Sequence, residues 1–214
     1  MRSFANIHAG ETCTIIGNGP SLKSVPAAFL HKYPSFGTNR IYLLDNFTPN
    51  FYVSVNPLVI EQCKDEINEL HCIKFITSTM AHLIYGSYPI ISNGIPRFCY
   101  EPYNEIYEGF TVTFAAMQLA YYMGFDTVLL VGVDHRFKFD GAPNMKQYLE
   151  KDDKNHFSPD YFKDKFWHTP DLERSNEAYK MANEAFLADD RMIINLTPNS
   201  GTSVFNTQEL RSWL

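Results

Sequence analysis

The chain has 214 residues, of which 45% are hydrophobic, and its formal net charge is −6 at pH 7. This length suits one sizeable core, so we expect a single domain over residues 1–214. The negative charge disfavours sequence-independent binding to nucleic acid. No apolar run reaches the roughly 18 residues that indicate a membrane span, and the first residues lack the apolar core of a signal peptide. We therefore expect a cytoplasmic protein without a membrane span.

Short apolar runs alternate with segments of helical periodicity, a pattern typical of an α/β protein. We expect a Rossmann-like domain with a mostly parallel sheet and helices on both faces. The predicted strands span residues 12–16, 35–39, 51–55, 73–77, 127–133 and 192–196, and the predicted helices span 58–70, 112–124 and 170–188. The second of these helices is apolar on nearly every side, which indicates that it is buried beside the sheet.

The sequence between the fifth predicted strand and the last predicted helix has no sustained period. Residues 135–168, called the lid segment here, are polar and aromatic by turns. A long segment of this kind inside a compact domain is typical of an active-site lid or of a disordered insert. Its many aromatic residues favour the lid, because disordered inserts are poor in them.

The glycine turn in "CTIIGNGPSLKS", residues 13–24, matches neither of two well-known phosphate-binding motifs. A P-loop needs a second glycine where Leu22 stands, and Pro20 removes one backbone amide from its cradle. A dinucleotide fingerprint fails at Leu22 as well. NAD binding is therefore not expected.

A weaker interpretation of this turn survives. The first predicted strand delivers Gly17, Asn18 and Gly19 to the carboxyl edge of the sheet, and Pro20 can start a helix whose free amides attract an anion. The glycines would let a ligand approach the backbone closely, and the Ser21 hydroxyl would add a hydrogen bond. An ordinary strand-to-helix turn is the alternative.

Asparagines also end two further strands. Asn39 follows the second strand, and Asn56 follows the third. In a parallel sheet both would converge with Asn18 on the edge where ligands bind. Because an amide both donates and accepts hydrogen bonds, this set suits ribose hydroxyls, base edges or sugar amides.

Asp134 comes directly after the strongly apolar fifth strand. It is therefore expected at the same carboxyl edge, with Arg136 leading into the lid segment. An aspartate in this position can bind Mg²⁺, orient a hydroxyl or cap a turn, and the sequence leaves these three roles open.

Two histidines of the lid segment are candidate general bases. His168 precedes Thr169, the expected N-cap of the last helix, and the dipole of that helix would disfavour imidazolium and keep the base neutral. A base near ambient pH at the mouth of a site can take a proton from a hydroxyl. His156 is the rival candidate, and binding is the role that we assign to it.

Several blocks in order resemble the 6-hydroxymethylpterin diphosphokinase-like family, which also includes flagellin-linked motility accessory factors. These blocks are "IIGNGPSL", "FGTNRIYL", "QLAYYMGFDTVLLVGVDHRF", "NHFSPDYF" and "ERSNEAYKMANEAF". The resemblance covers nearly the whole chain, and it implies a Rossmann-like fold and a nucleotide-dependent diphosphate transfer.

A more distant resemblance links the chain to bacterial sialyltransferases that use CMP-sialic acid without a metal. It is carried by "GNGPSLK", by asparagines at two strand ends, by "GVD" and by "PNS". The resemblance implies that His168 is the general base and that the donor is contacted by Asn18, Asn39, Asn56, Asn199 and Ser200. Arg136 stands where these enzymes have a tyrosine, and Gly109 to Thr111 stand where they have an arginine. Tyr161 and Tyr148 are candidates for the missing tyrosine role, and Thr111 lies at the same expected edge of the site.

The leading hypothesis is a nucleotide-sugar-dependent glycosyltransferase with no metal requirement and no tightly bound cofactor. A CMP-type sugar nucleotide is the expected co-substrate, and a glycan or a small molecule is the expected acceptor. His168 would deprotonate the acceptor hydroxyl, while Arg136, Tyr161 or Lys165 would stabilise the leaving phosphate.

Two alternatives stay open. The first is an Mg-ATP-dependent diphosphokinase acting on a pterin-like alcohol, with metal ligands drawn from Asp134, Asp140, Asp152 and Asp153. The second is a non-catalytic nucleotide-binding module of a surface-glycan or flagellar system. For the apolar and aromatic residues 84–103, an interface of a homo-oligomer and ordinary core packing are both compatible with the sequence.

Overall fold

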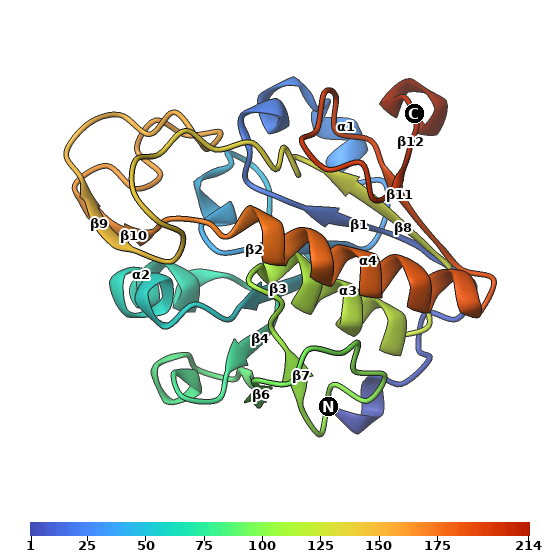
Figure 1. The fold of residues 1–214 in the computed structure, drawn as a ribbon. Coiled ribbons are helices and arrows are strands. Elements are labelled where there is room, and N and C mark those ends of the chain that lie inside the picture. Colours follow the sequence, from blue (N-terminus) through green and yellow to red (C-terminus); the bar gives the residue numbers. More distant parts are fainter.

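One eight-stranded sheet, parallel throughout, runs through the protein in a computed structural model that describes residues 1–214 (Figure 1). Across the sheet the order is β12 (Asn206–Thr207), β11 (Met192–Asn195), β8 (Thr127–Val131), β1 (Thr12–Ile16), β2 (Ser35–Thr38), β3 (Phe51–Ser54), β4 (Ile73–Thr77) and β5 (Tyr88–Ile90). All six predicted strands form, within two residues of their predicted ends. The predicted α/β fold class is confirmed.

The strand order reverses at the centre of the sheet. β1 to β5 follow one another to one side of β1, and the chain then crosses to β8, which pairs with the other side of β1. Ile16 at the end of β1 lies opposite Gly37 in β2 and Val131 in β8. In open parallel sheets, ligands bind at the carboxyl ends of the strands beside such a reversal.

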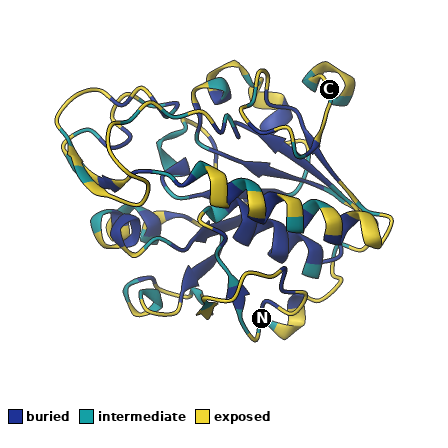
Figure 2. Cartoon of the chain, viewed as in Figure 1, coloured by how far each residue is buried: buried dark blue, intermediate teal, exposed yellow.

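Helices cover both faces of the sheet because successive strand side chains point to opposite sides. Ile15 belongs to a core with α3 (Val112–Tyr122) and α4 (Leu172–Ala188). Ile16 belongs to a second core with α1 (Ala27–Leu30) and α2 (Pro57–Glu69). In Figure 2 the strands and α3 are dark blue and the outer side of α4 is yellow, which agrees with the predicted burial of the apolar helix α3.

The lid segment contains an antiparallel hairpin formed by β9 (Lys146–Leu149) and β10 (Lys165–His168). Its aromatic residues Phe157, Tyr161 and Trp167 are buried in the core that includes α2. The segment is therefore structured, which contradicts the alternative of a disordered insert. Its aromatic residues lie in the hairpin and in the core at irregular spacing along the chain. This spacing explains why the sequence shows no helical or strand periodicity there.

The remaining regular structure is short. A parallel pair is formed by β6 (Ser92–Asn93) and β7 (Ile106–Tyr107), and 3-10 turns span Arg2–Phe4, Pro20–Ser24, Ile41–Leu43, Ala81–Leu83 and Leu210–Trp213. None of the helices is long and apolar enough to cross a membrane.

The last long helix begins later than predicted. Asp171 is the N-cap of α4, and its carboxylate accepts a hydrogen bond from the Arg174 backbone amide at 3.1 Å. Thr169, the predicted cap, instead donates to the Ala142 carbonyl at 2.7 Å and accepts from the Met145 amide at 2.9 Å. The Thr169 hydroxyl is thus hydrogen-bonded to the lid segment. Asp171, a better capping residue two positions later, caps the helix instead.

Candidate functional site

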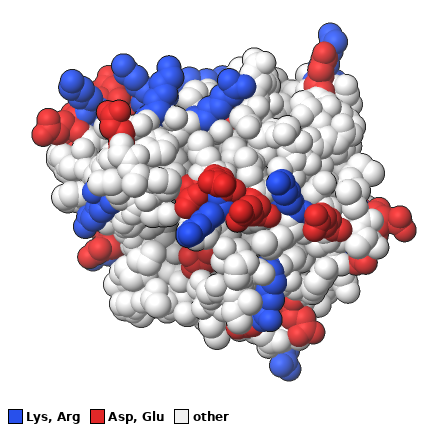
Figure 3. Space-filling model, viewed as in Figure 1, with Lys and Arg blue, Asp and Glu red and all other residues white.

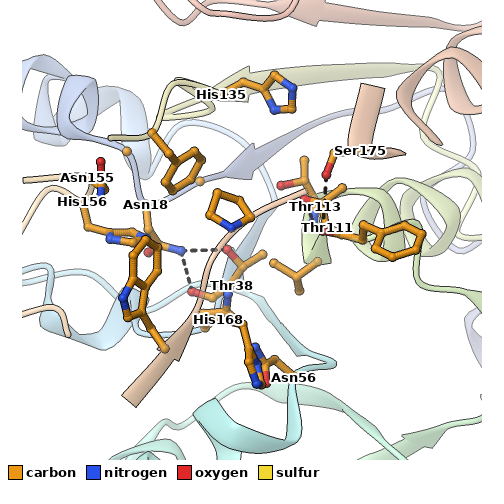
Figure 4. A pocket seen from close by; sticks show the side chains of 18 of the residues that line it. Asn18, Thr38, Asn56, Thr111, Thr113, His135, Asn155, His156, His168 and Ser175 are labelled. Carbon is orange, nitrogen blue, oxygen red and sulfur yellow. Dashed lines mark hydrogen bonds between the residues drawn. The ribbon is translucent and has the colours of Figure 1, made fainter. Parts of the chain in front are cut away.

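A cavity of about 470 Å³ opens at the carboxyl ends of the central strands (Figure 4). Strand ends, helix starts and the lid segment all contribute to its wall. The predicted site residues that line it are Gly17, Asn18, Gly19, Asn39, Asn56, Thr111, Asp134, His156, Tyr161 and His168. Ser21, Arg136, Asn199 and Ser200 are not part of the wall.

Asn18 presents an unpaired acceptor at the cavity. Its side-chain amide donates to the Thr38 carbonyl at 3.0 Å and to the Thr38 hydroxyl at 2.9 Å. These bonds fix the orientation of the amide and leave Oδ1 buried without a partner. Because a buried unpaired acceptor is costly, this oxygen is suited to a donor group on a ligand.

The other two strand-end asparagines have local structural partners. Asn39 has a left-handed backbone with φ 48° and accepts at Oδ1 from the Ser54 hydroxyl at 3.2 Å. Asn56 caps α2, because its Oδ1 accepts from the Leu58 amide at 3.0 Å. The structure brings both residues to the cavity with Asn18, as the parallel sheet predicts. Each amide nitrogen stays available to a ligand.

The glycine turn fits against the loop after β8 and forms the floor of the cavity. The Gly17 amide donates to the Val131 carbonyl at 2.8 Å, and the Gly19 amide donates to the Gly132 carbonyl at 2.9 Å. A Cβ atom on Gly19 would collide with the Asp134 carboxylate. Glycine is thus required here by the close approach of two loops, and the approach of a ligand to these glycines stays a prediction.

Asp134 caps the turn that follows the glycines. Its carboxylate accepts from the Ser21 amide at 3.2 Å and from the Ser21 hydroxyl at 2.6 Å. The helix expected after Pro20 is a 3-10 turn of five residues. Among the three roles left open by the sequence, the geometry is that of a turn cap, and the amide expected to hold an anion is already bonded.

Three helices begin at the cavity wall. The wall includes Asn56 and Pro57 of α2, Thr111 to Thr113 of α3, and Pro170 to Leu172 of α4. Thr111 caps α3 by accepting from the Thr113 amide at 3.3 Å. Because the N-terminal end of a helix carries a partial positive charge, three such ends favour an anionic ligand. No Lys or Arg side chain lines the cavity, although such side chains gather at the outer edge over the lid segment in Figure 3.

His168 stands at the end of β10, and in Figure 4 it lies near Asn56 on the rim of the cavity. Partial burial and the positive charge of Lys146 lower its pKa from the ordinary value. A neutral imidazole near pH 7 is what the sequence predicts, but the cause differs. Burial and then Lys146, the cross-strand partner of His168, lower the pKa, whereas the predicted cause was the helix dipole.

His156 lies beside Asn18 in the wall of the cavity (Figure 4). Its Nδ1 is 2.8 Å from Oδ2 of Asp153, a carboxylate that is 5% exposed. Its ring stacks on Tyr161 at a centroid distance of 4.0 Å. The Tyr161 hydroxyl accepts from the Arg40 amide at 3.1 Å, and burial raises the pKa of that phenol.

His135 is a cavity residue that sequence reasoning did not select. It has a left-handed backbone with φ 50°, its side chain is buried, and its Nε2 has no partner. Burial lowers its pKa from the ordinary value. Non-glycine residues in this conformation are uncommon and gather at functional sites. No periodicity or motif in the sequence indicates that His135 has a left-handed backbone.

Three predicted site residues point elsewhere. Arg136 is exposed and packs near Gly201. Asn199 is exposed with φ 52°. The Ser200 hydroxyl donates to the Val133 carbonyl at 2.8 Å, behind the floor of the cavity. The structure therefore does not bring these side chains to the cavity.

The carboxylates at the cavity do not form a magnesium cage. Both carboxylate oxygens of Asp134 accept hydrogen bonds from Ser21. The Asp171 carboxylate accepts hydrogen bonds from the Arg174 amide and from the Asn144 side chain. Burial raises the pKa of Glu108, the third carboxylate in the wall. No group of three or more His, Cys, Asp or Glu side chains is arranged to hold a metal ion. The residues present thus do not fit a protein-built Mg²⁺ site.

Comparison with known proteins identifies the family of the chain. No curated protein matches the chain. The sequence profile of the family described as 6-hydroxymethylpterin diphosphokinase MptE-like matches residues 1–140. The matched part contains the glycine turn, the three asparagines and Asp134, and it ends within the lid segment. The sialyltransferase resemblance stays a prediction. The chain therefore belongs to the 6-hydroxymethylpterin diphosphokinase MptE-like family.

Proposed function

We propose that this protein is a nucleotide-dependent transferase that moves a group from a phosphate-activated donor to a hydroxyl acceptor. The observation that supports this proposal is the cavity at the strand-order reversal. Three helix N-termini, the unpaired Asn18 Oδ1 and His168 all lie at this cavity. A volume of about 470 Å³ is within the range of small-molecule sites.

The donor class that this geometry supports best is a nucleotide sugar. Amide groups of Asn18, Asn39 and Asn56 suit the hydroxyls and base edge of such a donor, because they both donate and accept. The helix ends stabilise its phosphates without a Lys or Arg side chain. The aromatic lid segment would exclude water, which otherwise competes with the acceptor.

His168 is the general base of the proposed reaction. Its imidazole takes the proton of the acceptor hydroxyl while that oxygen forms a bond to the anomeric carbon of the donor. The bond from the anomeric carbon to the phosphate oxygen breaks, and the nucleotide leaves with both electrons of that bond. A lowered pKa supports the role, since the base is then neutral at the pH where it must act.

Diphosphate transfer from ATP to an alcohol is the second candidate, and family membership is the observation that favours it. Transfer of this kind needs divalent ions to neutralise the phosphates. The carboxylates at the cavity have other partners, so the nucleotide itself would have to supply most of the metal ligands.

Hydrolysis of sugar nucleotides tests the proposal. CMP-, UDP- and GDP-sugars are incubated with the protein in EDTA or in Mg²⁺, and released nucleotide is measured. We expect slow release in EDTA that His168→Gln abolishes and that His82→Gln, an exposed histidine away from the cavity, leaves intact.

Release of AMP from ATP with a pterin-like alcohol, dependent on Mg²⁺, would instead establish the second candidate. Nucleotide binding without turnover of any donor would support a non-catalytic module and contradict both transfer reactions.

A further inference from the structure

His156 is held rigidly beside the glycine turn. The amide of the next residue, Phe157, donates to the Asn18 carbonyl at 2.9 Å. The imidazole stacks flat on Tyr161 with an interplanar angle of 3° and meets the edge of Phe162 at a centroid distance of 5.2 Å. These contacts fix the ring plane and its position relative to Asn18.

A buried carboxylate fixes the proton of this ring. Asp153 Oδ2 lies 2.8 Å from His156 Nδ1, and Asp153 Oδ1 accepts from the Asn155 amide at 2.8 Å. Because an ionised carboxylate only accepts hydrogen bonds, Nδ1 carries a proton. The opposite nitrogen, Nε2, makes no hydrogen bond within the protein, and His156 lines the cavity. An imidazole oriented by a carboxylate in this way presents one nitrogen to a ligand.

A side-chain cation would add to the helix N-termini in binding a phosphate. None of its lining residues is Lys or Arg, so only His135, His156 and His168 can carry positive charge there. Burial lowers the pKa of His135, and burial together with Lys146 lowers that of His168. His156 alone among the three has a carboxylate partner, since Asp153 Oδ2 lies 2.8 Å from its Nδ1.

We propose that His156, oriented by Asp153, is the phosphate ligand of this cavity, with Nε2–H donating to an oxygen of the donor phosphate. This inference rests on the proposed function, because it assumes a phosphate-bearing donor. In this arrangement the ring donates from Nδ1 to the Asp153 carboxylate and from Nε2 to the phosphate, so both hydrogen bonds have a charged acceptor. The ring thus binds the phosphate, while His168 acts on the acceptor.

The test separates affinity for phosphate from affinity for nucleoside. Titration calorimetry measures Kd for CMP, UMP, GMP and AMP and for each matching nucleoside. In the wild-type protein we expect the monophosphate of the preferred base to bind tighter. We expect His156→Gln to reduce the ratio of the two Kd values by about tenfold or more, the worth of one charge-assisted bond. Asp153→Asn should reduce it less, and His82→Gln, an exposed histidine away from the cavity, should leave it unchanged.

A second measurement uses the wild-type protein, so it tests the inference even if the His156 variant does not fold. Long-range ¹H–¹⁵N spectra of the wild-type protein show which histidine has its proton fixed on Nδ1. We expect the Nε2 resonance of that ring to shift when CMP or inorganic pyrophosphate is added, and an unmoved resonance would overturn the inference.

The possible outcomes separate the two proposals. An unchanged Kd ratio in folded His156→Gln would overturn the role of His156 and leave the proposed function standing. Equal affinity of the wild-type protein for nucleosides and monophosphates would overturn both.

Discussion

Asp134 offers the sharpest test of what the site residues do. Its carboxylate accepts two hydrogen bonds from Ser21, at 3.2 Å from the amide and at 2.6 Å from the hydroxyl. Asp134→Ala removes both. Hydrogen bonds to charged groups contribute about 1.5–3 kcal/mol each. Asp134 is half-buried, so water replaces part of the loss, and we expect the free energy of unfolding to fall by about 2–3 kcal/mol.

Asp134→Asn separates a turn cap from a chemical role. An asparagine keeps the shape of the side chain, accepts one bond from Ser21 and donates to the Ser21 hydroxyl. We therefore expect a smaller loss of about 1 kcal/mol, since only the charge assistance disappears. If Asp134 bound a metal or took part in proton transfer, this variant would instead lose activity at nearly full stability.

The assay is urea unfolding followed by circular dichroism, with Ser21→Ala and the double variant completing a double-mutant cycle. Because both residues belong to one hydrogen-bonded pair, we expect a coupling free energy of about 1–2 kcal/mol. A loss below about 0.5 kcal/mol for Asp134→Ala, within the range of ordinary surface substitutions, would refute the cap. Strict additivity of the two single variants would refute it as well.

Three further expectations follow from the site. Burial lowers the pKa of His135, so the unfolded chain binds its proton more tightly, and stability should fall as pH drops below about 6.5; His168 adds a slope of the same sign. Urea unfolding at pH 5.5 and 7.5 measures this slope, and His135→Asn, which tolerates the left-handed backbone, should reduce it. Asp171→Ala should cost about 1 kcal/mol of stability and Asp171→Asn little, because both Asp and Asn cap helices; equal losses in thermal melting would contradict the assigned cap. Tyr161→Phe loses the bond from the Arg40 amide, so stability should fall by about 1 kcal/mol while donor hydrolysis persists; loss of hydrolysis in the folded variant would make the hydroxyl catalytic.

The long strands and the convergence of asparagines were predictable, because both follow from local pattern and parallel geometry. Runs such as Thr12–Ile16 and Ile73–Thr77 have strand composition and clear ends. The edge strands β5 and β12 are short and carry polar or Pro residues, so their sequences resemble loops. Once β1, β2 and β3 are parallel neighbours, the positions of Asn18, Asn39 and Asn56 follow without any tertiary detail.

Other parts of the site depend on contacts that no local pattern encodes. His156 reaches the cavity because the lid segment folds against the glycine turn, where the Phe157 amide donates to the Asn18 carbonyl. His135, in the loop after β8, has a left-handed backbone and an unpaired Nε2. In the same way, Ser21 was assigned to a ligand because its partner Asp134 lies 113 residues away in the sequence. Long-range partners of this kind decide whether a polar side chain is available.

That separation of 113 residues also sets when the floor of the cavity forms during folding. The glycine turn after β1 is completed only by the loop after β8, and β2 to β5 are synthesised between the two. Contacts between distant parts of a chain form slowly, because the intervening loop must first be closed. Competence to bind a nucleotide should therefore appear together with the last step of sheet assembly, and an N-terminal fragment that ends before β8 should lack it.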